Sequence, residues 1–584
     1  MIQICKRDDH NSYIRSIGDM EEYEQLKKLL TRVSSKFFDE TYKTWACDTA
    51  AAKRIVEITT KPDISVNLKL QPYMYQLQCL NDCINKDKRL IHLSCGAGKT
   101  VCALMLYQYL VDNKMLDGQG VIVVKATLKN QWMDEVKKFT SFNSVIIDTY
   151  KSFTSNYQSR LKTRDKKMKT LLKESAIKNK EQIAKLDKEI IELKTEMNDK
   201  FISLFNKNNN LLILNFETLD DDMVKQVLAK INPDFWFVDE IDNIKDPDTK
   251  RNKNISIFSN AKYKFGATAT PIRKNPVDLY GVFHFLKPDL FPNREGFEAR
   301  YTKKYFGRIC GSQNEEELSN IIAPYIFNRT FDEISDQLPQ QTVIQKYCDL
   351  TLAQQKMHKK LMTEISELKE QQEVLASKFT AMQLRNNAEY EKLNGNIIAR
   401  QTFAQMLADS EELLAMSDSN LSKAYLTDTK ASSKVELCKE LVFNILSSGE
   451  KVCVFSKYLK IQDILEREIN NLGLVNQEIV KLNGALSSEE RQEVLNKYNS
   501  SGNCNVLLVS DAAESGVNLK STKYLIEFDL ADSAAKQTQR HGRITRADSI
   551  HKNVIVYQLI ARGSFDEIAL MIIEKKAKYA EDIL

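Results

Sequence analysis

Two series of short apolar runs, each alternating with stretches of helical periodicity, constrain the fold of this chain more than any other feature. The first series spans about residues 89–270 and the second 451–559. The runs contain many β-branched residues and few polar ones, which is typical of parallel strands covered by helices on both faces. The sequence therefore predicts an α/β protein with two lobes, each built on a parallel sheet. The 584 residues are enough for two or three domains.

Composition limits the expected partners and compartment. Lys and Arg outnumber Asp and Glu by only five, 84 against 79, so nucleic-acid binding would need a local basic groove. The eleven cysteines have no paired CxxC spacing, which argues against zinc sites and disulfides. No apolar stretch is long enough for a signal peptide or a membrane span. We expect a reduced, cytoplasmic protein that does not contact membranes.

Two strongly charged segments interrupt the alternation, at about residues 155–205 and 352–432. In each segment apolar residues recur at steps of three and four, with polar Gln372 interrupting the second series, which places them in a stripe on one face of a long helix. The first stripe is Ile183, Leu186, Ile190, Leu193 and Met197, and the second is Leu361, Ile365, Leu368, Leu375, Phe379 and Met382. These segments are predicted to be helical insertions that pack on their own lobes or pair as hairpins. A coiled coil that recruits a protein partner is the alternative.

A glycine-rich turn directly follows the first apolar run and precedes a helical pattern. Its residues are Ser94, Cys95, Gly96, Ala97, Gly98, Lys99 and Thr100. Backbone N–H groups at the glycines can close around phosphate oxygens, the Lys99 ammonium adds positive charge, and the Thr100 hydroxyl can bind Mg²⁺. The turn therefore predicts a site for ATP and Mg²⁺, with an ordinary tight turn as the alternative.

A pair of carboxylates, Asp239 and Glu240, ends the apolar run FWFV. Phosphoryl transfer needs acidic groups at such a strand end. We expect Asp239 to hold Mg²⁺, mostly through water, and Glu240 to orient and deprotonate the attacking water. A solvated turn is the alternative, but the position of the pair after the phosphate loop disfavours it.

Three further segments resemble motifs of helicase superfamily 2, whose members are ATPases with two tandem RecA-like lobes. GATATP at 266–271 matches the motif that couples nucleotide to DNA in that family. LQPYMYQ at 70–76 resembles the adenine-reading segment, in which Gln76 would contact the base and Tyr73 or Tyr75 would stack on it. QRHGRITR at 539–546 matches the family's QxxGRxxR.

The QxxGRxxR segment supplies the second half of the expected active site. Two-lobed motors deliver positive charge across the cleft as an arginine finger, so that hydrolysis depends on closure of the lobes. Gln539, Arg543 and Arg546 are the candidates. The two arginines lie three residues apart and are predicted to share one helix face near the γ-phosphate. A solvated basic face is the alternative.

Other positions that match the family are expected to contact nucleic acid, and Gly516 is expected to let the backbone approach the nucleotide. These candidate nucleic-acid contacts are Lys125, Asn215, Thr268, Ser456, Lys457, Gly484, Ser510 and Asn518. Each is also compatible with an ordinary loop.

The segment between the lobes resembles the connector of Swi/Snf-like members of this superfamily. The residues that carry this resemblance are Arg329, Leu338, Pro339, Leu350, Thr351 and Gln354. The segment DEIDNIK departs from the branch's DEAHxIKN at Ile241 and Asp242. We predict lobe 1 over residues 66–345, with the insertion at about 155–205, and lobe 2 over 346–584, with the insertion at about 352–432.

The first 65 residues are predicted to form a separate small α+β module. A strand, a turn, a second strand and a helix here resemble the substrate-binding module of the HARP annealing helicases. Phe37, Phe38, Asp39, Lys43 and Trp45 carry the resemblance. Basic side chains of the module could contact phosphates. They are Lys36, Lys43, Lys53 and Arg54.

These resemblances imply an ATP-dependent translocase that remodels double-stranded or forked DNA by annealing, branch migration or displacement of bound protein. Two alternatives stay open. One is an RNA- or transcription-linked ATPase of the same superfamily. The other is a scaffold subunit that binds nucleotide as a switch, although such a switch does not need the complete set of hydrolytic residues.

Overall fold

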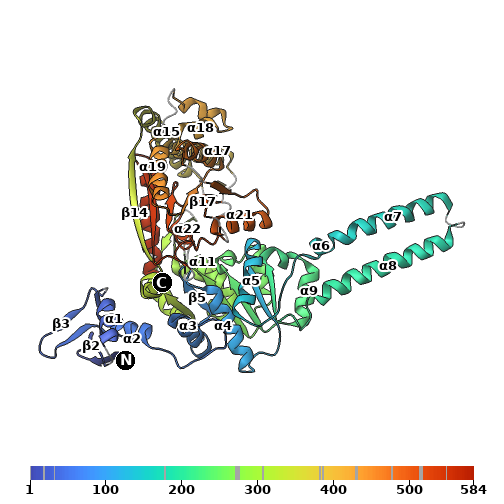
Figure 1. The fold of residues 1–584 in the computed structure, drawn as a ribbon, viewed down its shortest axis with the longest axis horizontal. Coiled ribbons are helices and arrows are strands. Elements are labelled where there is room, and N and C mark those ends of the chain that lie inside the picture. The colour runs from blue at the N-terminus through green and yellow to red at the C-terminus, as the bar shows by residue number, and fades with distance from the viewer. Residues whose placement is uncertain are drawn as a thin grey trace.

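The computed structural model describes residues 2–17, 20–31, 33–175, 179–269, 276–305, 308–379, 383–384, 387–427, 432–474, 478–500, 502–511, 517–546 and 549–583. These residues form a small N-terminal unit, two lobes and two helical insertions (Figure 1). The prediction of an α/β protein with two parallel-sheet lobes is confirmed.

Lobe 1 contains a seven-stranded sheet in which all neighbouring strands are parallel. Across the sheet the strands are β13 (Ile326–Arg329), β5 (Leu90–Leu93), β10 (Tyr263–Thr268), β9 (Phe235–Asp239), β6 (Gly120–Val124), β8 (Leu211–Asn215) and β7 (Ser144–Ile146). Val121 and Val123 of β6 enter one buried cluster, whereas Ile122 and Val124 enter the other. Because both faces are buried, the strands have continuously apolar sequences.

Helices cover both faces of this sheet (Figure 1). They are α3 (Met74–Asn85), α4 (Lys99–Asp112), α5 (Lys129–Phe139), α9 (Asp222–Ile231), α10 (Lys250–Ser256) and α11 (Val277–Leu286). After α11 the chain adds α12 (Arg294–Tyr301), the antiparallel strands β11 (Thr302–Tyr305) and β12 (Arg308–Ser312), and α13 (Glu315–Ile322). Among the described residues, no helix has both the length and the apolar character needed to cross a membrane.

Lobe 2 contains a six-stranded parallel sheet. Its order is β14 (Gln340–Asp349), β19 (Asn553–Arg562), β18 (Tyr524–Glu527), β15 (Val452–Ser456), β17 (Cys504–Ser510) and β16 (Glu478–Leu482). The helices of this lobe are α19 (Ser433–Ser447), α20 (Leu459–Asn470), α21 (Ser488–Ser500), α22 (Ala534–His541) and α23 (Phe565–Ile583).

The division between the lobes differs from the predicted boundary at 345/346. The last strand of lobe 1, β13, ends at Arg329, and the short helix α14 (Phe331–Ile334) follows it. Strand β14 then pairs with β19 along its whole length, from Gln340 to Asp349. The predicted boundary therefore cuts through a strand of lobe 2 and is wrong, because backbone pairing with a distant segment cannot be read from the connector's own sequence.

Both charged segments form paired helices. In lobe 1 the short α6 (Tyr150–Phe153) leads into α7 (Ser155–Ser175), which pairs with α8 (Lys180–Ser203) in a hairpin that projects from the lobe (Figure 1). In lobe 2, α15 (Leu352–Ala376) pairs with α17 (Ala388–Asp409), and α18 (Glu411–Ala415) follows. Leu361 is buried in a core cluster of lobe 2. Of the predicted second stripe, Phe379 lies beyond the end of α15, and Met382 lies outside the described residues.

The N-terminal unit is an antiparallel four-stranded sheet with two helices. In sheet order the strands are β1 (Ile2–Lys6), β2 (Asn11–Ser16), β4 (Thr44–Asp48) and β3 (Phe37–Asp39), and the helices are α1 (Met20–Thr31) and α2 (Thr49–Thr59). Strands β1 and β2 were not predicted, since their short polar-rich sequences carry little periodicity. The ring centroids of Phe38 and Trp45 lie 5.3 Å apart in an edge arrangement, and Phe38 is 41% exposed.

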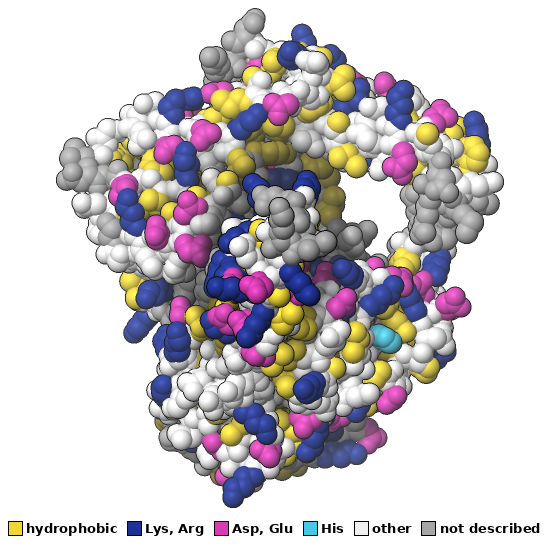
Figure 2. All heavy atoms as spheres, turned by 90° about the vertical axis from the view of Figure 1, so that its right-hand side faces the viewer, with side chains coloured by type: hydrophobic (Ala, Val, Ile, Leu, Met, Phe, Trp, Pro, Cys, Tyr) yellow, Lys and Arg dark blue, Asp and Glu magenta, His cyan; other side chains and the backbone are white. Residues whose placement is uncertain are grey.

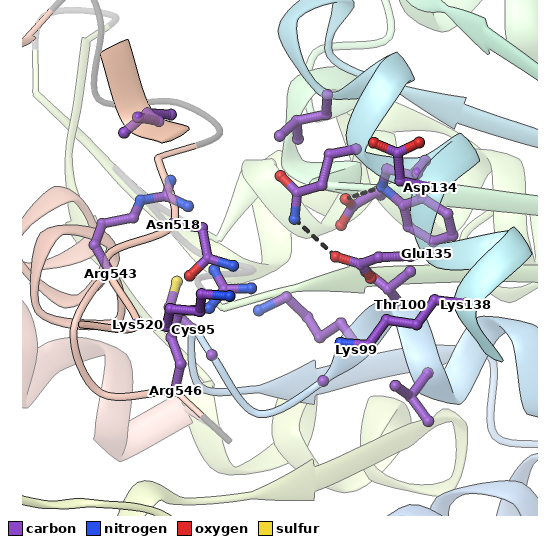
Figure 3. Close-up of a pocket in the computed structure, with 18 of the residues that line it drawn as sticks. Cys95, Lys99, Thr100, Asp134, Glu135, Lys138, Asn518, Lys520, Arg543 and Arg546 are labelled. Atoms are coloured by element: carbon purple, nitrogen blue, oxygen red, sulfur yellow. Dashed lines mark hydrogen bonds between the residues drawn. The ribbon is translucent and has the colours of Figure 1, made fainter. Parts of the chain in front are cut away.

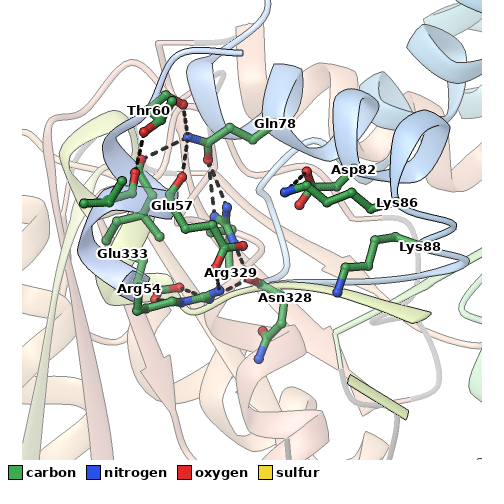
Figure 4. Close-up of polar contacts among 12 residues, drawn as sticks. Arg54, Glu57, Thr60, Gln78, Asp82, Lys86, Lys88, Asn328, Arg329 and Glu333 are labelled. Atoms are coloured by element: carbon green, nitrogen blue, oxygen red, sulfur yellow. Dashed lines mark hydrogen bonds and ion pairs between the residues drawn. The ribbon is translucent and has the colours of Figure 1, made fainter. Parts of the chain in front are cut away.

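Helix α2 of the N-terminal unit docks on lobe 1 through a polar network (Figure 4). Arg54 donates to both carboxylate oxygens of Glu333, at 2.7 and 2.9 Å, and to the Asn328 carbonyl at 2.8 Å. The Gln78 amide donates to three carbonyls at the end of α2, the closest being that of Thr60 at 2.8 Å. Arg54 therefore holds the unit on lobe 1, and its predicted contact with phosphate is not supported, because its guanidinium is already paired.

Arg329 lies at the centre of this network, and its removal is expected to destabilise the protein. Its guanidinium is 2% exposed, donates to the Gln78 carbonyl oxygen at 3.2 and 3.3 Å, and pairs with Glu57 at 3.2 Å. We expect Arg329→Ala to lower the free energy of unfolding by about 2–4 kcal/mol, since a buried acceptor loses its donors. The control is Lys6→Ala, which removes a pair with Asp9 in which both side chains are exposed and should cost less than about 1 kcal/mol. Equal shifts in denaturant unfolding of the two variants would contradict this assignment.

Candidate functional site

The glycine-rich turn joins β5 to α4 at the carboxyl edge of the lobe 1 sheet. Gly96 and Gly98 adopt φ of +80° and +72°, in the left-handed region that favours glycine. A Cβ on Gly96 would collide with the Thr545 carbonyl of lobe 2, and a Cβ on Gly98 would collide with the Gln76 amide. Both glycines are thus required by conformation and by space. The turn presents the N-terminus of α4, which favours bound anions.

A pocket of about 570 Å³ lies over this turn and is lined by residues of both lobes (Figure 3). Its basic lining side chains are Lys99, Lys125, Lys138, Lys520, Arg543 and Arg546, and its acidic ones are Asp134, Glu135, Asp239 and Glu240. The Lys99 ammonium donates to the carbonyls of Leu93 and Ser94, both at 3.2 Å. This concentration of cations at a helix N-terminus suits a polyphosphate.

Asp239 ends the buried strand β9 inside this pocket. The Trp132 indole donates to its Oδ2 at 3.1 Å, and the Glu240 backbone N–H donates to its Oδ1 at 3.0 Å. Burial raises the pKa of Asp239 to about 6, and the neighbouring Glu240 adds to this shift while Lys99 opposes it. A buried carboxyl with too little positive charge around it is a site that a divalent cation would stabilise, and Thr100 lines the same pocket. The two side chains fit Mg²⁺.

Glu240 has an unusual backbone conformation, with φ 49° and ψ 52°. A non-glycine residue in this region costs on the order of 1–3 kcal/mol and is a feature of functional sites. The turn aims the Glu240 side chain across the cleft, where the Gln539 amide of α22 donates to its Oε2 at 3.2 Å. The predicted catalytic carboxylate and the predicted QxxGRxxR segment are therefore in direct contact.

Arg543 and Arg546 line the pocket opposite Lys99, but they do not share a helix face as predicted (Figure 3). Helix α22 ends at His541, Arg543 lies in the turn that follows, and Arg546 lies just beyond that turn. At Gly542 the backbone packs so closely on Cys95 that a Cβ there would collide with the Cys95 Cβ. Tertiary contact with the phosphate loop at this glycine ends the helix, which the spacing of the arginines could not indicate.

Sequence reasoning missed a buried polar network behind the arginine-bearing turn. Arg540 is fully buried and donates to the Asp511 carboxylate. His541 bridges Glu527 at 3.2 Å and Gln341 at 2.9 Å. Burial works to raise the pKa of Glu527, but His541 and Arg540 outweigh it and hold that pKa below its usual value. Because Arg540 lies between Gln539 and Arg543, the motif itself was the available signal, but burial could not be read from it.

The predicted adenine-reading segment packs behind the phosphate loop. The Gln76 side chain is 2% exposed, accepts from the Tyr73 backbone N–H at 3.0 Å, and donates to the Ala97 carbonyl at 3.4 Å. Tyr75 is buried and donates to the same carbonyl at 2.9 Å, so it cannot stack on a base in this arrangement. Tyr73 is partly exposed and stacks on Tyr75, and it is the remaining stacking candidate.

The predicted nucleic-acid contacts fall into different environments. Lys125 and Asn518 line the pocket over the glycine-rich turn. Lys457 pairs with Asp532 at 2.8 Å, and Gly484 is exposed. Gly516, the predicted site of close backbone approach, lies outside the described residues.

Four of the predicted contact residues are buried. They are Asn215, Thr268, Ser456 and Ser510. The Thr268 hydroxyl donates to Asp242 at 2.9 Å, which ties β10 to the turn after β9. Asn215 likewise bonds within lobe 1, to Glu217 at 2.6 Å and Thr218 at 2.5 Å, whereas the buried hydroxyls of Ser456 and Ser510 have no hydrogen-bond partner among the described residues. In this arrangement the predicted contact of these four side chains with nucleic acid is not supported.

Sequence reasoning also missed polar residues that lobe 2 contributes to the pocket. Gln492, Asn496 and Asn499 of α21 line it opposite Gln131 of α5. Isolated amides on a charged helix carry no sequence signal, and only the approach of the lobes gives them a place at the site.

Two family models match the chain. The SNF2-related domain matches residues 75–406, and the helicase conserved C-terminal domain matches residues 433–548. A chromodomain-helicase-DNA-binding protein 3 homolog of Caenorhabditis elegans is 22% identical over 87% of this chain and 26% of its own length. The probable ATP-dependent DNA helicase CHR12 of Arabidopsis thaliana is 24% identical over 88% of this chain and 42% of its own length. The chain thus spans less than half the length of these curated relatives.

Among solved structures, the Sulfolobus solfataricus SWI2/SNF2 ATPase core in complex with dsDNA is similar at 21% identity, with 89% of this chain and 94% of that chain covered and a TM-score of 0.37. The SNF2-related match alone covers more than half of the sequence, and the helicase C-terminal match continues it through lobe 2. This protein therefore belongs to the SNF2-related family.

Proposed function

We propose that this protein hydrolyses ATP in the cleft between its lobes and uses the cycle to translocate along double-stranded or forked DNA. The observation that carries the proposal is the contact of Gln539 with Glu240, which joins the expected finger segment of one lobe to the expected catalytic carboxylate of the other. Because neither lobe holds a complete site, closure and hydrolysis are coupled.

The pocket residues divide the chemistry of hydrolysis between them. The Gly96 to Gly98 turn and Lys99 bind the phosphates. Glu240 accepts a proton from the attacking water while the water oxygen bonds to the γ-phosphorus. The bond from that phosphorus to the bridging oxygen breaks, and Arg543 and Arg546 stabilise the charge on the departing diphosphate and the transferred group. Mg²⁺ held through Thr100 and Asp239 would neutralise the phosphate oxygens.

DNA as the track is supported by membership of the SNF2-related family and by a relative whose name describes a DNA helicase. The test is steady-state ATP hydrolysis with equal amounts of duplex DNA, forked DNA, single-stranded DNA and RNA, with Glu240→Gln as the blank. The greatest stimulation by duplex or forked DNA supports a DNA translocase. If RNA stimulates most, an RNA-directed ATPase replaces the proposal, and if no nucleic acid stimulates, a nucleotide-switched scaffold or partner-activated ATPase does.

The SNF2-related match does not cover the N-terminal unit. We further propose that this unit contacts forked DNA. Lys43 and Lys53 are exposed, whereas Lys36 donates to the Thr31 carbonyl at 2.9 Å. The slope of log affinity against log salt concentration counts the phosphates that a protein neutralises. We expect K43Q/K53Q to lower the magnitude of this slope by about 2 for forked DNA and to leave binding of plain duplex nearly unchanged. The matched control is K27Q/K61Q on the same unit. Equal losses on both DNA forms would count against a fork-binding module.

A further inference from the structure

The face of α7 that points away from its hairpin partner carries a line of lysines. Lys162, Lys166, Lys169 and Lys173 recur at steps of four, three and four, so they lie along one side of the helix. All four are exposed. At 1.5 Å per residue the line extends about 16 Å.

The apolar seam of the hairpin fixes the direction of this lysine line. Leu161, Met168 and Leu171 of α7 pack against Leu186 and Ile190 of α8. At 100° per residue the lysines project from nearly the opposite side of α7. In Figure 1, α8 lies below α7, and lobe 2 rises above lobe 1 on the side of the hairpin where α7 lies.

The charge of this face is not balanced by the partner helix. Three of the α8 carboxylates pair elsewhere: Glu189 with Arg164 at 3.4 Å, Glu192 with Lys188 at 3.9 Å, and Glu196 with Lys200 at 2.7 Å. Among the described residues, no ion pair engages any of the four α7 lysines. Thr163 and Thr170 flank the line on one side, and Asp165 and the half-exposed Leu172 flank it on the other.

The base of the hairpin is anchored in the core of lobe 1. Phe201 of α8 is fully buried there, and its ring lies 5.0 Å from Tyr150, 5.2 Å from Phe153 and 5.5 Å from Phe205, between centroids. An arm fixed in this way holds its surface at a constant position relative to the lobe. Figure 2 looks toward the end of the hairpin, and Lys and Arg side chains gather near the centre of this face.

We propose that the lysine face of α7 binds the phosphate backbone of duplex DNA beyond the segment held by the two lobes. This inference rests on the proposed function, because it extends the contact of the same motor with its track. Regularly spaced ammonium groups along one side of a helix match the charge of a phosphate backbone, and four lysines beside the single carboxylate of Asp165 favour a polyanion. The arm thereby lengthens the DNA footprint without entering the ATP site.

The test compares DNA binding by the full-length protein and two four-lysine variants. The first, K162Q/K166Q/K169Q/K173Q, removes the lysine face, and glutamine preserves the helix. The matched control, K180Q/K185Q/K188Q/K194Q, removes the same charge from exposed positions of α8. Fluorescence anisotropy over a salt series gives the slope of log affinity against log salt. On a long duplex we expect the magnitude of this slope to fall by about 2–4 in the α7 variant and by less than about 1 in the control.

The outcomes separate this inference from the proposed function. A wild-type slope in the α7 variant, equal losses in both variants, or a loss on duplex RNA but not on duplex DNA would overturn the inference. Hydrolysis of ATP without DNA is expected to be unchanged in both variants, because neither set of lysines lines the nucleotide pocket. If the wild-type protein binds duplex DNA but its hydrolysis is not stimulated, the proposed translocase fails while the binding assay still decides the role of α7.

Discussion

Replacing Arg543 with alanine is expected to lower the kcat of ATP hydrolysis by about 10³- to 10⁵-fold, the effect of losing an arginine finger. The backbone of Arg543 is fixed, because its N–H donates to the Arg540 carbonyl at 3.0 Å and its own carbonyl accepts from Leu519 at 3.3 Å. Its side chain lines the pocket that contains Lys99 and Glu240. A cation at this position is expected to stabilise the transition state, so its loss should affect kcat much more than ATP affinity.

The measurement is single-turnover hydrolysis with saturating DNA, together with the Kd for ATP and for duplex DNA. The control is Arg467→Ala, which removes an exposed arginine of α20 that pairs with Glu412 of α18 and should leave kcat within about threefold. DNA affinity of Arg543→Ala should stay within several-fold of wild type. Hydrolysis by Arg543→Ala within tenfold of wild type would mean that the lobe contact serves another purpose than transition-state stabilisation.

Features set by local sequence and by burial on both sides of a sheet could be predicted. The strands of both sheets have continuous apolar sequences because helices cover both faces, and the carboxylates of β9 stand out because they end such a run. The glycines at 96 and 98 were identified because the turn needs backbone conformations that other residues adopt at a cost. Each of these features depends on residues near one another in the chain.

Features that depend on contact between distant segments were missed or wrongly placed. The end of α22 is set by packing of Gly542 on Cys95 across the cleft, so the spacing of Arg543 and Arg546 suggested a helix that the structure does not have. Pairing of β14 with β19 placed the lobe boundary earlier than the connector sequence indicated. Arg54 docks the N-terminal unit by pairing with Glu333, which lies far away in the sequence. This pairing cannot be predicted without the fold.

Replacing Glu240 with glutamine is expected to lower kcat by about 10²- to 10⁴-fold, the contribution of a general base, while ATP binding is retained. The substitution is informative because of the Gln539 contact. A glutamine carbonyl oxygen can accept the same hydrogen bond from Gln539 that the Glu240 Oε2 accepts at 3.2 Å, so contact between the lobes persists. What disappears is the carboxylate that, in the proposed mechanism, takes the proton from water.

Two comparisons separate proton transfer from closure of the lobes. Glu135→Gln neutralises another carboxylate of the same pocket, one that accepts from Gln131 at 2.8 Å, and should change kcat by less than about threefold. Gln539→Ala breaks the lobe contact but keeps the base, so it should weaken the coupling of hydrolysis to DNA more than hydrolysis without DNA. If Glu240→Gln and Gln539→Ala gave the same profile, Glu240 would act through lobe contact alone, and the general base would have to be sought elsewhere in the pocket.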